Sequence, residues 1–171
     1  GEYDKDIYTS SSSGLKWATP VAIKGGVNTA ADDVSNNISF DGTKMLLHRD
    51  DNGQIDIYES TLKGASWSDP AKLHFQISSN RANEIYGAYS NDGWSIYFSR
   101  DNSTRSTGYD IMYSSMQSKM EKDFKAATML AEVNTGFNDG PIYLHIDGET
   151  MYIASQGRAS MGGYDIFVSK K

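Results

Sequence analysis

Six charged residues of this 171-residue chain have the types and spacing that could carry chemistry. Three are acids that each precede an Asp-Gly dipeptide, and three are arginines that each follow one: Asp33, Glu84 and Asp139, with Arg49, Arg100 and Arg158. Two carboxylates at a working distance hydrolyse glycosidic bonds, and several together bind a hard cation such as Ca2+. An arginine beside a carboxylate gives a polar rim that grips a peptide or a glycan, or an ion pair that ties structural units together. The residue types alone leave these alternatives open.

Other catalytic and metal-binding chemistry finds no support in the sequence. The histidines His48, His74 and His145 have no metal-ligand spacing, and no HExxH motif is present. The chain has no cysteine, which excludes disulfides, thiolate metal sites and a cysteine nucleophile. It also lacks a nucleophile-elbow motif. We therefore assign no catalytic residue and no metal ligand.

The elements that must position the six charged residues are repeats of about fifty residues. The phrase Asp6-Ile7-Tyr8-Thr9-Ser10 returns in three variants, at steps of 50, 54 and 55 residues. These variants begin at Asp56, Asp110 and Asp165. A fixed period of this length is typical of a repeat architecture, so function can reside in a surface built by several repeats.

Each repeat also contains an Asp-Gly dipeptide followed by an apolar run. The dipeptides are Asp41-Gly42, Asp92-Gly93 and Asp147-Gly148. Asp-Gly between apolar segments predicts a β-hairpin whose two central turn residues have positive φ. We expect paired strands at 38–40 and 44–48, the second covered on two sides because it is apolar on both faces. Further strands are expected at 55–60 and 67–73, whereas 116–124 is interpreted as an elongated loop.

Two more landmarks recur in the same order. An aromatic follows the Asp-Ile phrase at Trp17, Trp67 and Phe124, and we interpret the two tryptophans as core between repeats. An asparagine precedes each acid of the repeat: Asn28, Asn80 and Asn134. Four landmarks in constant order favour true structural repeats over chance similarity.

Four short strands per unit are the plan of a β-propeller blade, a four-stranded antiparallel sheet. We predict an all-β fold with a single propeller region that covers the whole chain. Its expected parts are a partial blade at 1–32, blades at 33–83 and 84–138, and a partial blade at 139–171.

These parts amount to about three blades' worth of strands, whereas closed propellers typically have four to eight blades. The chain is then a fragment of a larger propeller, or its partial blades pair across a dimer, or its two ends meet in a small ring. We favour the fragment. An open propeller leaves unpaired strand edges, and these predict self-association through the incomplete blades.

Composition narrows the function further. The net charge of −6 argues against a nucleic-acid partner, because a protein that follows phosphates needs a basic face. No apolar run is long enough to span a bilayer. Aromatic residues make up 12% of the chain and include 11 tyrosines, which favours an all-β protein over a disordered one.

Two phrases resemble the TolB-type propeller repeat: Ser-Asn-Asp-Gly-Trp-Ser-Ile-Tyr-Phe-Ser at 90–99 and Gly-Gly-Tyr-Asp-Ile-Phe-Val-Ser at 162–169. In that repeat an Asp-Gly turn leads to an apolar strand, a Gly-rich loop and Asp-Ile-Tyr. The variant with Val133-Asn134-Thr135 before Asp139 resembles propellers of Bacteroidetes envelope proteins, which often also carry an OmpA-like peptidoglycan-binding domain. The resemblance covers nearly the whole chain, and it implies export to the periplasm or outer membrane and a scaffold role.

In a propeller, the loops between second and third strands gather on one face, where binding residues are common. Here these loops are 49–54, 100–108 and 156–163, and we expect their arginines to form a polar loop face. The acids start the innermost strands, so we expect them to crowd a central channel. Like charges there raise a pKa or attract a cation, and calcium is the cofactor alternative.

We therefore predict a non-catalytic binding and scaffolding module of the bacterial cell envelope. It would engage a protein or cell-wall glycan through the polar loop face. The alternative is a carbohydrate-active hydrolase that uses the acids of the channel. Such an enzyme loses turnover by orders of magnitude when one essential acid is replaced, whereas a binding module loses only modest affinity.

Overall fold

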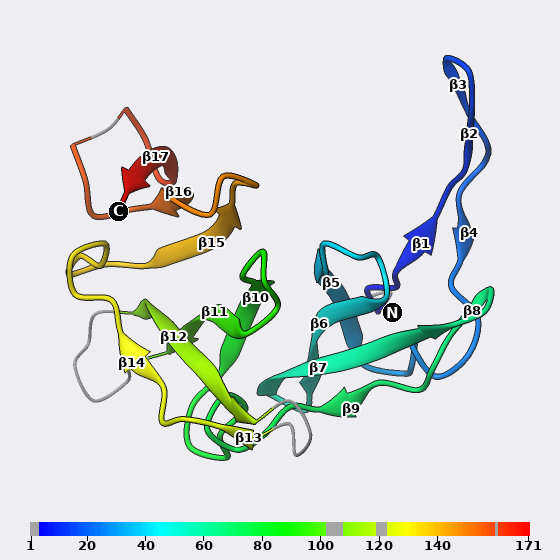
Figure 1. Cartoon of the computed structure of the whole chain (residues 1–171), viewed down its shortest axis with the longest axis horizontal. Coiled ribbons are helices and arrows are strands. Elements are labelled where there is room, and N and C mark those ends of the chain that lie inside the picture. Colours follow the sequence, from blue (N-terminus) through cyan, green and yellow to red (C-terminus); the bar gives the residue numbers. More distant parts are fainter. Residues whose placement is uncertain (1–3, 102–107, 119–122, 160) are drawn as a thin grey trace.

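The computed structural model describes residues 4–101, 108–118, 123–159 and 161–171. Every regular element of this described part is a β-strand, and the strands pair antiparallel. The sheets follow one another in an arc from the N-terminal unit to the C-terminal sheet (Figure 1). Over these ranges, no helix is long and apolar enough to cross a membrane.

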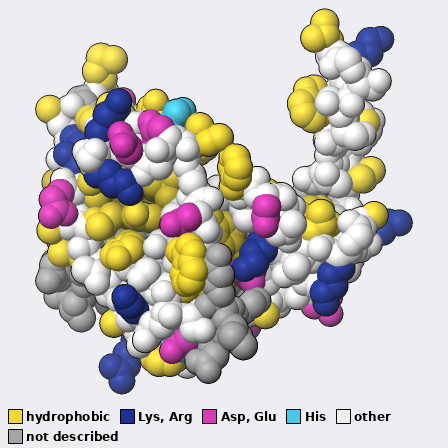
Figure 2. All heavy atoms as spheres, viewed as in Figure 1, with side chains coloured by type: hydrophobic (Ala, Val, Ile, Leu, Met, Phe, Trp, Pro, Cys, Tyr) yellow, Lys and Arg dark blue, Asp and Glu magenta, His cyan; other side chains and the backbone are white. Residues whose placement is uncertain are grey.

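The N-terminal unit is small. β1 (Tyr8–Thr9) pairs with β4 (Val21–Ala22), and between them β2 (Ser12–Ser13) and β3 (Lys16–Trp17) form a hairpin. This hairpin projects away from the body of the molecule (Figure 1), and hydrophobic side chains are exposed along it (Figure 2).

The two tryptophans at equivalent repeat positions have different surroundings. Trp67 packs against the buried cluster that contains Ile7 and Met45. Trp17 is 74% exposed, so the prediction that it belongs to the core between repeats is wrong. The reason is that Trp17 lies on the projecting hairpin, beside which none of the described sheets packs.

Two sheets of the same plan form the centre of the molecule. The first contains β5 (Asp32–Ile38), β6 (Lys44–Asp51), β7 (Gln54–Lys63), β8 (Ser66–Trp67) and β9 (Ala71–Lys72). The second contains β10 (Glu84–Tyr89), β11 (Ser95–Asp101), β12 (Tyr109–Ser118), β13 (Asp123–Phe124) and β14 (Thr128–Met129). In both sheets three long strands lie side by side, and the short fourth strand, β9 or β14, pairs with the third.

The C-terminal sheet has three strands, β15 (Asp139–Leu144), β16 (Thr150–Ser155) and β17 (Asp165–Lys170). They correspond to the first three strands of the two central sheets. Each sheet is thus built from the repeat that the sequence predicts, and the all-β antiparallel fold is confirmed.

The described residues of the stretch expected to be an elongated loop, 116–118 and 123–124, are strand. β12 continues to Ser118, and β13 follows with Phe124, which is 3% exposed. Met116 pairs with Phe124 across this extension, so an apolar contact holds the two strands together. Residues 119–122 lie outside the described part of the chain.

Three apolar clusters join successive sheets. The strand β6 contributes to two of them, because Met45 and Leu47 point toward the N-terminal unit and Leu46 points toward the second central sheet. This confirms that the strand at 44–48 is covered on both sides. The third cluster joins β12 to β16 through Ile111 and Ile153.

The first strands of the three sheets, β5, β10 and β15, are the innermost. β10 contacts both β5 and β15. In each of these strands the pairing register shifts: after Ser35 in β5, after Ile85 in β10 and after Asp139 in β15. A β-bulge at this place re-aims side chains toward the neighbouring sheet.

The Asp-Gly turns differ from the predicted geometry, in which both central residues have positive φ. Gly42 has a φ of 72°, but Asp41 does not have a positive φ. The Gly42 amide donates to the Ser39 carbonyl at 2.8 Å, and the Asp41 carboxylate accepts from the Thr43 amide at 3.0 Å. Hydrogen bonds from Ser39 and Thr43 lower the pKa of Asp41 to about 2. The aspartate therefore stabilises the turn through its side chain, and only the glycine needs the left-handed conformation.

Candidate functional site

Asp33 is buried at the start of β5 and is held by its own linker. Its Oδ2 atom accepts hydrogen bonds from the Thr29 amide at 2.7 Å and the Thr29 hydroxyl at 2.9 Å. Its Oδ1 atom accepts from Nε of Arg49 at 2.6 Å. Arg49 also donates from Nη2 to the carbonyls of Gly26 and Val27. The pair thus fastens the first two strands of the sheet to the linker before it.

The next repeat has the same arrangement around Glu84. Its carboxylate accepts from the Ser79 amide at 3.1 Å, the Ser79 hydroxyl at 2.9 Å and Nε of Arg100 at 2.8 Å. Arg100 donates to the carbonyls of Gln76 and Ile77. Burial raises the pKa of Glu84 to about 7, against the opposing effect of its hydrogen bonds with Ser79 and Arg100.

The third repeat builds an incomplete version. Asp139 accepts from the Thr135 amide at 2.6 Å and the Thr135 hydroxyl at 2.9 Å. Ser155 stands at the arginine position, and Arg158 comes from the following loop to donate to the Val133 carbonyl at 2.8 Å. The Oδ1 atom of Asp139 and the Nε atom of Arg158 are both buried without a hydrogen-bond partner.

A polar residue of each linker also holds the third strand of the preceding unit. Asn28 accepts from the Ile7 amide at 2.8 Å and donates to the Ile7 carbonyl at 3.0 Å. Asn134 makes the same two contacts with Ile111, at 2.6 and 2.9 Å. Each of these linkers is thereby fixed along the preceding third strand.

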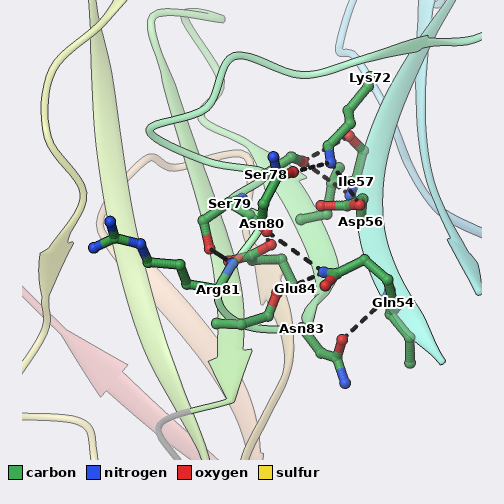
Figure 3. Close-up of polar contacts among 12 residues, drawn as sticks. Gln54, Asp56, Ile57, Lys72, Ser78, Ser79, Asn80, Arg81, Asn83 and Glu84 are labelled. Carbon is green, nitrogen blue, oxygen red and sulfur yellow. Dashed lines mark hydrogen bonds and ion pairs between the residues drawn. The ribbon is translucent and has the colours of Figure 1, made fainter.

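In the second linker Ser78, and not Asn80, makes these two contacts. The Ser78 hydroxyl accepts from the Ile57 amide at 3.0 Å and donates to the Ile57 carbonyl at 2.8 Å (Figure 3). Asn80 instead accepts from the Lys72 side chain at 3.0 Å. The second linker has one more residue than the other two between its acid and the side chain that contacts the third strand. An alignment of the three linkers on their asparagines therefore misplaces the second linker by two positions.

One set of linker residues was missed by the sequence reasoning. The residue directly before each acid accepts a hydrogen bond from the backbone at or just before the third strand of the preceding unit. The pairs are Asp32 with the Lys5 amide, Asn83 with the Ile55 amide and Asn138 with the Tyr109 amide. The available signal was an Asp or Asn at the same place in all three linkers. Gln54 adds a further contact in the second linker, to the Ala82 carbonyl at 2.8 Å.

These contacts give the six predicted charged residues clear structural roles. The acids are buried and bonded to their own linkers, and the arginines point inward onto linker carbonyls. Within the described ranges, no group of three or more metal-ligating side chains is present. A role for these residues in binding a partner stays a prediction.

We call the end of the molecule that carries the loops between second and third strands the loop end. It carries a different set of polar and aromatic side chains. Tyr86 lies in the bulge of β10 with a φ of 59°, a conformation that costs about 1–3 kcal/mol in a non-glycine residue. Its ring packs edge-on against His48, with the ring centroids 5.9 Å apart. Asn36 donates to Nδ1 of His48 at 2.8 Å and accepts from the Gly87 amide at 3.2 Å. Burial lowers the pKa of His48 to about 4, so its imidazole is neutral at pH 7.

Tyr109 and Tyr164 lie within electrostatic reach of Tyr86, and Asp50 and Asp101 lie within that of Tyr109. Burial raises the pKa of Tyr109, and the charges of Asp101 and Asp50 raise it further, as does Tyr86. Burial and Tyr86 likewise raise the pKa of Tyr164, which is 47% exposed. We call Tyr86, Tyr109, Tyr164, Asp50 and Asp101 the tyrosine–acid centre. Its residues lie on, or directly before, strands of all three large sheets.

The architecture defines the class of structure: successive four-stranded antiparallel units of the β-propeller type. Comparison with solved structures agrees with this class. TolB from Acinetobacter baumannii is similar over 97% of this chain, with a TM-score of 0.55 and 19% sequence identity. The chain therefore has a TolB-like fold. It spans 38% of the length of that TolB chain.

Comparison of the sequence gives no closer relation. No family model matches the chain, and no curated protein matches it. At 19% identity, the likeness to TolB shows the fold alone.

Proposed function

We propose that this chain is a non-catalytic binding module of the bacterial cell envelope and that it is exported. The TolB-like fold supports this proposal at a coarse level. In it, residues 33–83 and 84–138 act as propeller blades, and the chain carries a partner-binding surface on its loop end.

The observation that carries the proposal is the tyrosine–acid centre. Tyr86 is held there in a strained conformation by the surrounding strands, and such strain is concentrated at functional positions. Tyrosines offer large contact areas at low cost in conformational entropy, so they are enriched at binding surfaces. The buried acids of the linkers are bonded internally and are not available in the same way.

The chemistry of this centre favours a protein partner with a basic segment. Tyrosine rings attract Lys and Arg side chains through cation–π interactions. The carboxylates of Asp50 and Asp101 add a complementary negative charge, as does the net charge of −6 for the whole chain. A cell-wall glycan would instead stack on the tyrosine rings without needing the acids.

Titration of the isotope-labelled chain with a Lys- and Arg-rich peptide, followed by NMR, tests this proposal. We expect saturable shifts at Tyr86, Tyr109 and Tyr164, which weaken at high salt because the attraction is partly electrostatic. Tyr164→Ala should weaken binding by about tenfold. The control variant Tyr152→Ala changes an exposed tyrosine on the C-terminal sheet and should leave binding unchanged.

Two other results would contradict the proposal. Shifts that appear only with soluble peptidoglycan fragments would identify a glycan as the ligand. Equal peptide binding by the Tyr164→Ala variant would place the binding surface elsewhere. Export is tested separately, by fractionating cells that produce the natural protein and locating it with an antibody.

A further inference from the structure

A groove lies between the two central sheets, at the end of the strands that carries the Asp-Gly turns. We call this end the turn end, since it is opposite the loop end along the same strands. The groove has a volume of about 410 Å³, and small-ligand sites in proteins have about 300–1,000 Å³. Its lining includes Phe40, Asp41, Lys44, Tyr89, Asn91 and Asp92. The whole lining lies between positions 39 and 116, in the two central sheets and their turns.

Two side chains of the lining share one buried carboxylate. Tyr89 donates its hydroxyl to Oε2 of Glu59 at 2.8 Å, and Nζ of Lys44 lies 3.3 Å from the same atom. Tyr89 and Glu59 are buried, whereas Lys44 is only partly buried and reaches the groove. Burial and the charge of Glu59 raise the pKa of Tyr89, so its hydroxyl stays a donor. The shared carboxylate thus holds the amine of Lys44 at the wall of the groove.

The repeat does not require this polar set in order to join two sheets. In the next junction along the chain, the three positions of the set are occupied by Ser95, Tyr113 and Leu144. The strand register establishes the equivalence, because Tyr113 pairs with Tyr97 as Glu59 pairs with Leu46. None of the three replacements carries a charge at pH 7. The pairing of Lys44 with Glu59 is therefore particular to the junction that forms the groove.

An exposed aromatic ring forms part of the groove. Phe40 stands directly before the first Asp-Gly turn and is 71% exposed. At the equivalent position of the second central sheet, Asn91 donates to the His145 carbonyl at 3.0 Å and so ties its turn to the C-terminal sheet. The side chain of Phe40 has no donor and cannot make such a tie. Its ring instead gives the groove a flat apolar surface beside polar groups.

The polar lining combines hydrogen-bond donors with acceptors. Hydrogen bonds from Ser39 and Thr43 lower the pKa of Asp41 to about 2, so its carboxylate is ionised and accepts hydrogen bonds. Asp92 is an acceptor as well, whereas the ammonium group of Lys44 only donates. A cationic ligand would be repelled by Lys44, and an anionic ligand by the two aspartates. A neutral ligand rich in hydroxyl groups both donates and accepts, so it matches this lining.

We propose that the groove at the turn end binds a saccharide. The ring of Phe40 packs against the apolar face of a sugar ring, Lys44 donates to its hydroxyl oxygens, and the carboxylates of Asp41 and Asp92 accept from its hydroxyl groups. The site is separate from the tyrosine–acid centre and does not rest on the function proposed for that centre. The two sites can therefore be tested independently of each other.

The probes for this proposal are two uncharged trisaccharides, maltotriose and chitotriose, each titrated into the whole isotope-labelled chain and followed by NMR. We expect at least one of them to cause saturable shifts at Phe40, Lys44 and Tyr89. The dissociation constant should be about 1 mM, because an open groove covers only part of a small ligand. High salt should leave the affinity unchanged, since the ligand has no charge to be screened.

Three variants separate the groove from the rest of the surface. Phe40→Ala should weaken binding by about tenfold or more. Since Phe40 is exposed, this variant keeps its fold, which circular dichroism verifies. Phe137→Ala is the matched control, because it changes another exposed phenylalanine, in the linker before β15, and should leave the affinity unchanged. Lys44→Met keeps the aliphatic stem but removes the donor, and should weaken binding by about tenfold.

Four outcomes would overturn the proposal. The first is no saturable shift with either trisaccharide up to about 50 mM. The second is equal affinity for Phe40→Ala and the unchanged chain. The third is tighter binding of glycylglycine than of either trisaccharide, which would assign the groove to a zwitterionic ligand. The fourth is a set of shifts confined to Tyr86, Tyr109 and Tyr164, which would place the saccharide at the tyrosine–acid centre.

Discussion

Arg158 donates a hydrogen bond to the carbonyl oxygen of Val133 at 2.8 Å. It comes from a loop, whereas Arg49 and Arg100 come from the second strands of their sheets, β6 and β11. In the preceding repeat, Arg100 makes the corresponding contact with Ile77 and an ion pair with Glu84. Arg158 keeps the carbonyl contact but leaves Asp139 without an arginine. The junctions at Arg100 and Arg158 therefore share the hydrogen bond to a linker carbonyl, but of these two only the one at Arg100 also has an arginine–carboxylate ion pair.

This difference predicts unequal losses of stability. Arg100→Met removes the ionic partner of a buried carboxylate, so we expect the free energy of unfolding to fall by about 3 kcal/mol or more. Arg158→Met removes one hydrogen bond to a carbonyl and should cost about 1–2 kcal/mol. Urea unfolding of both variants measures the two losses. The double variant Arg100→Met/Glu84→Gln should recover part of the loss, and no recovery would show that the ion pair is not its cause.

The hydrogen bonds between linker side chains and the preceding third strands predict different losses of stability for substitutions of two asparagines. Asn134→Ala leaves the Ile111 amide without its partner and removes one of the two donors to the Ile111 carbonyl, which keeps the Leu130 amide, so it should cost about 2 kcal/mol in unfolding free energy. Asn80→Ala removes only an exposed contact with Lys72 and should cost less than about 0.5 kcal/mol. Thermal and urea unfolding provide the comparison. Equal losses would mean that Asn80, and not Ser78, holds the second linker.

His48 predicts a dependence of stability on pH. Its pKa is about 4 when folded against 6.5 as the ordinary value, so between these values the unfolded chain binds more protons. Stability is therefore lost as the pH falls through this window, by about 2 kcal/mol between pH 8 and pH 5. Glu84 acts in the opposite direction, because its raised pKa lowers stability as the pH rises from 4.5 to about 7.

Single substitutions isolate the contribution of His48. Relative to the unchanged chain, His48→Gln should become more stable by about 2 kcal/mol on going from pH 8 to pH 5, because the His48 loss is removed while the contribution of Glu84 stays in both. His145→Gln is the control, because this histidine is only partly buried and lies beside the Asp147-Gly148 turn. An unchanged pH profile in His48→Gln would refute the assignment.

We expect that no side chain is tolerated at the position of Gly140. It has a φ of 108°, and a Cβ atom there would collide with the Oγ atom of Ser99 on the neighbouring sheet. Gly140→Ala should therefore cost about 3 kcal/mol in unfolding free energy. Gly162→Ala, where a Cβ atom meets open space and φ is not positive, should change it by less than about 1 kcal/mol. A similar cost at both positions would contradict the close approach of the two sheets.

The sequence determined the repeat and therefore the fold. The Asp-Ile phrases mark third strands, and the apolar runs after Asp-Gly mark second strands, because a strand covered on both faces must be apolar on both. The sequence also located Asp33 and Glu84 at the starts of innermost strands and placed Arg49 and Arg100 in equivalent positions. These features are local, and their spacing is fixed by the length of each strand and turn.

Only the tertiary structure decided what each residue contacts. Arg158 comes from a loop where Arg49 and Arg100 come from strands, and Ser78 makes the contacts that asparagines make in the other two linkers, because distance in space and not sequence position selects a hydrogen-bond partner. Trp17 and Trp67 occupy the same repeat position, yet one is exposed and one packs against a core. Ile111 and Ile166 differ in the same way. Burial depends on whether a neighbouring unit covers the residue, and a local sequence pattern carries no information about that neighbour.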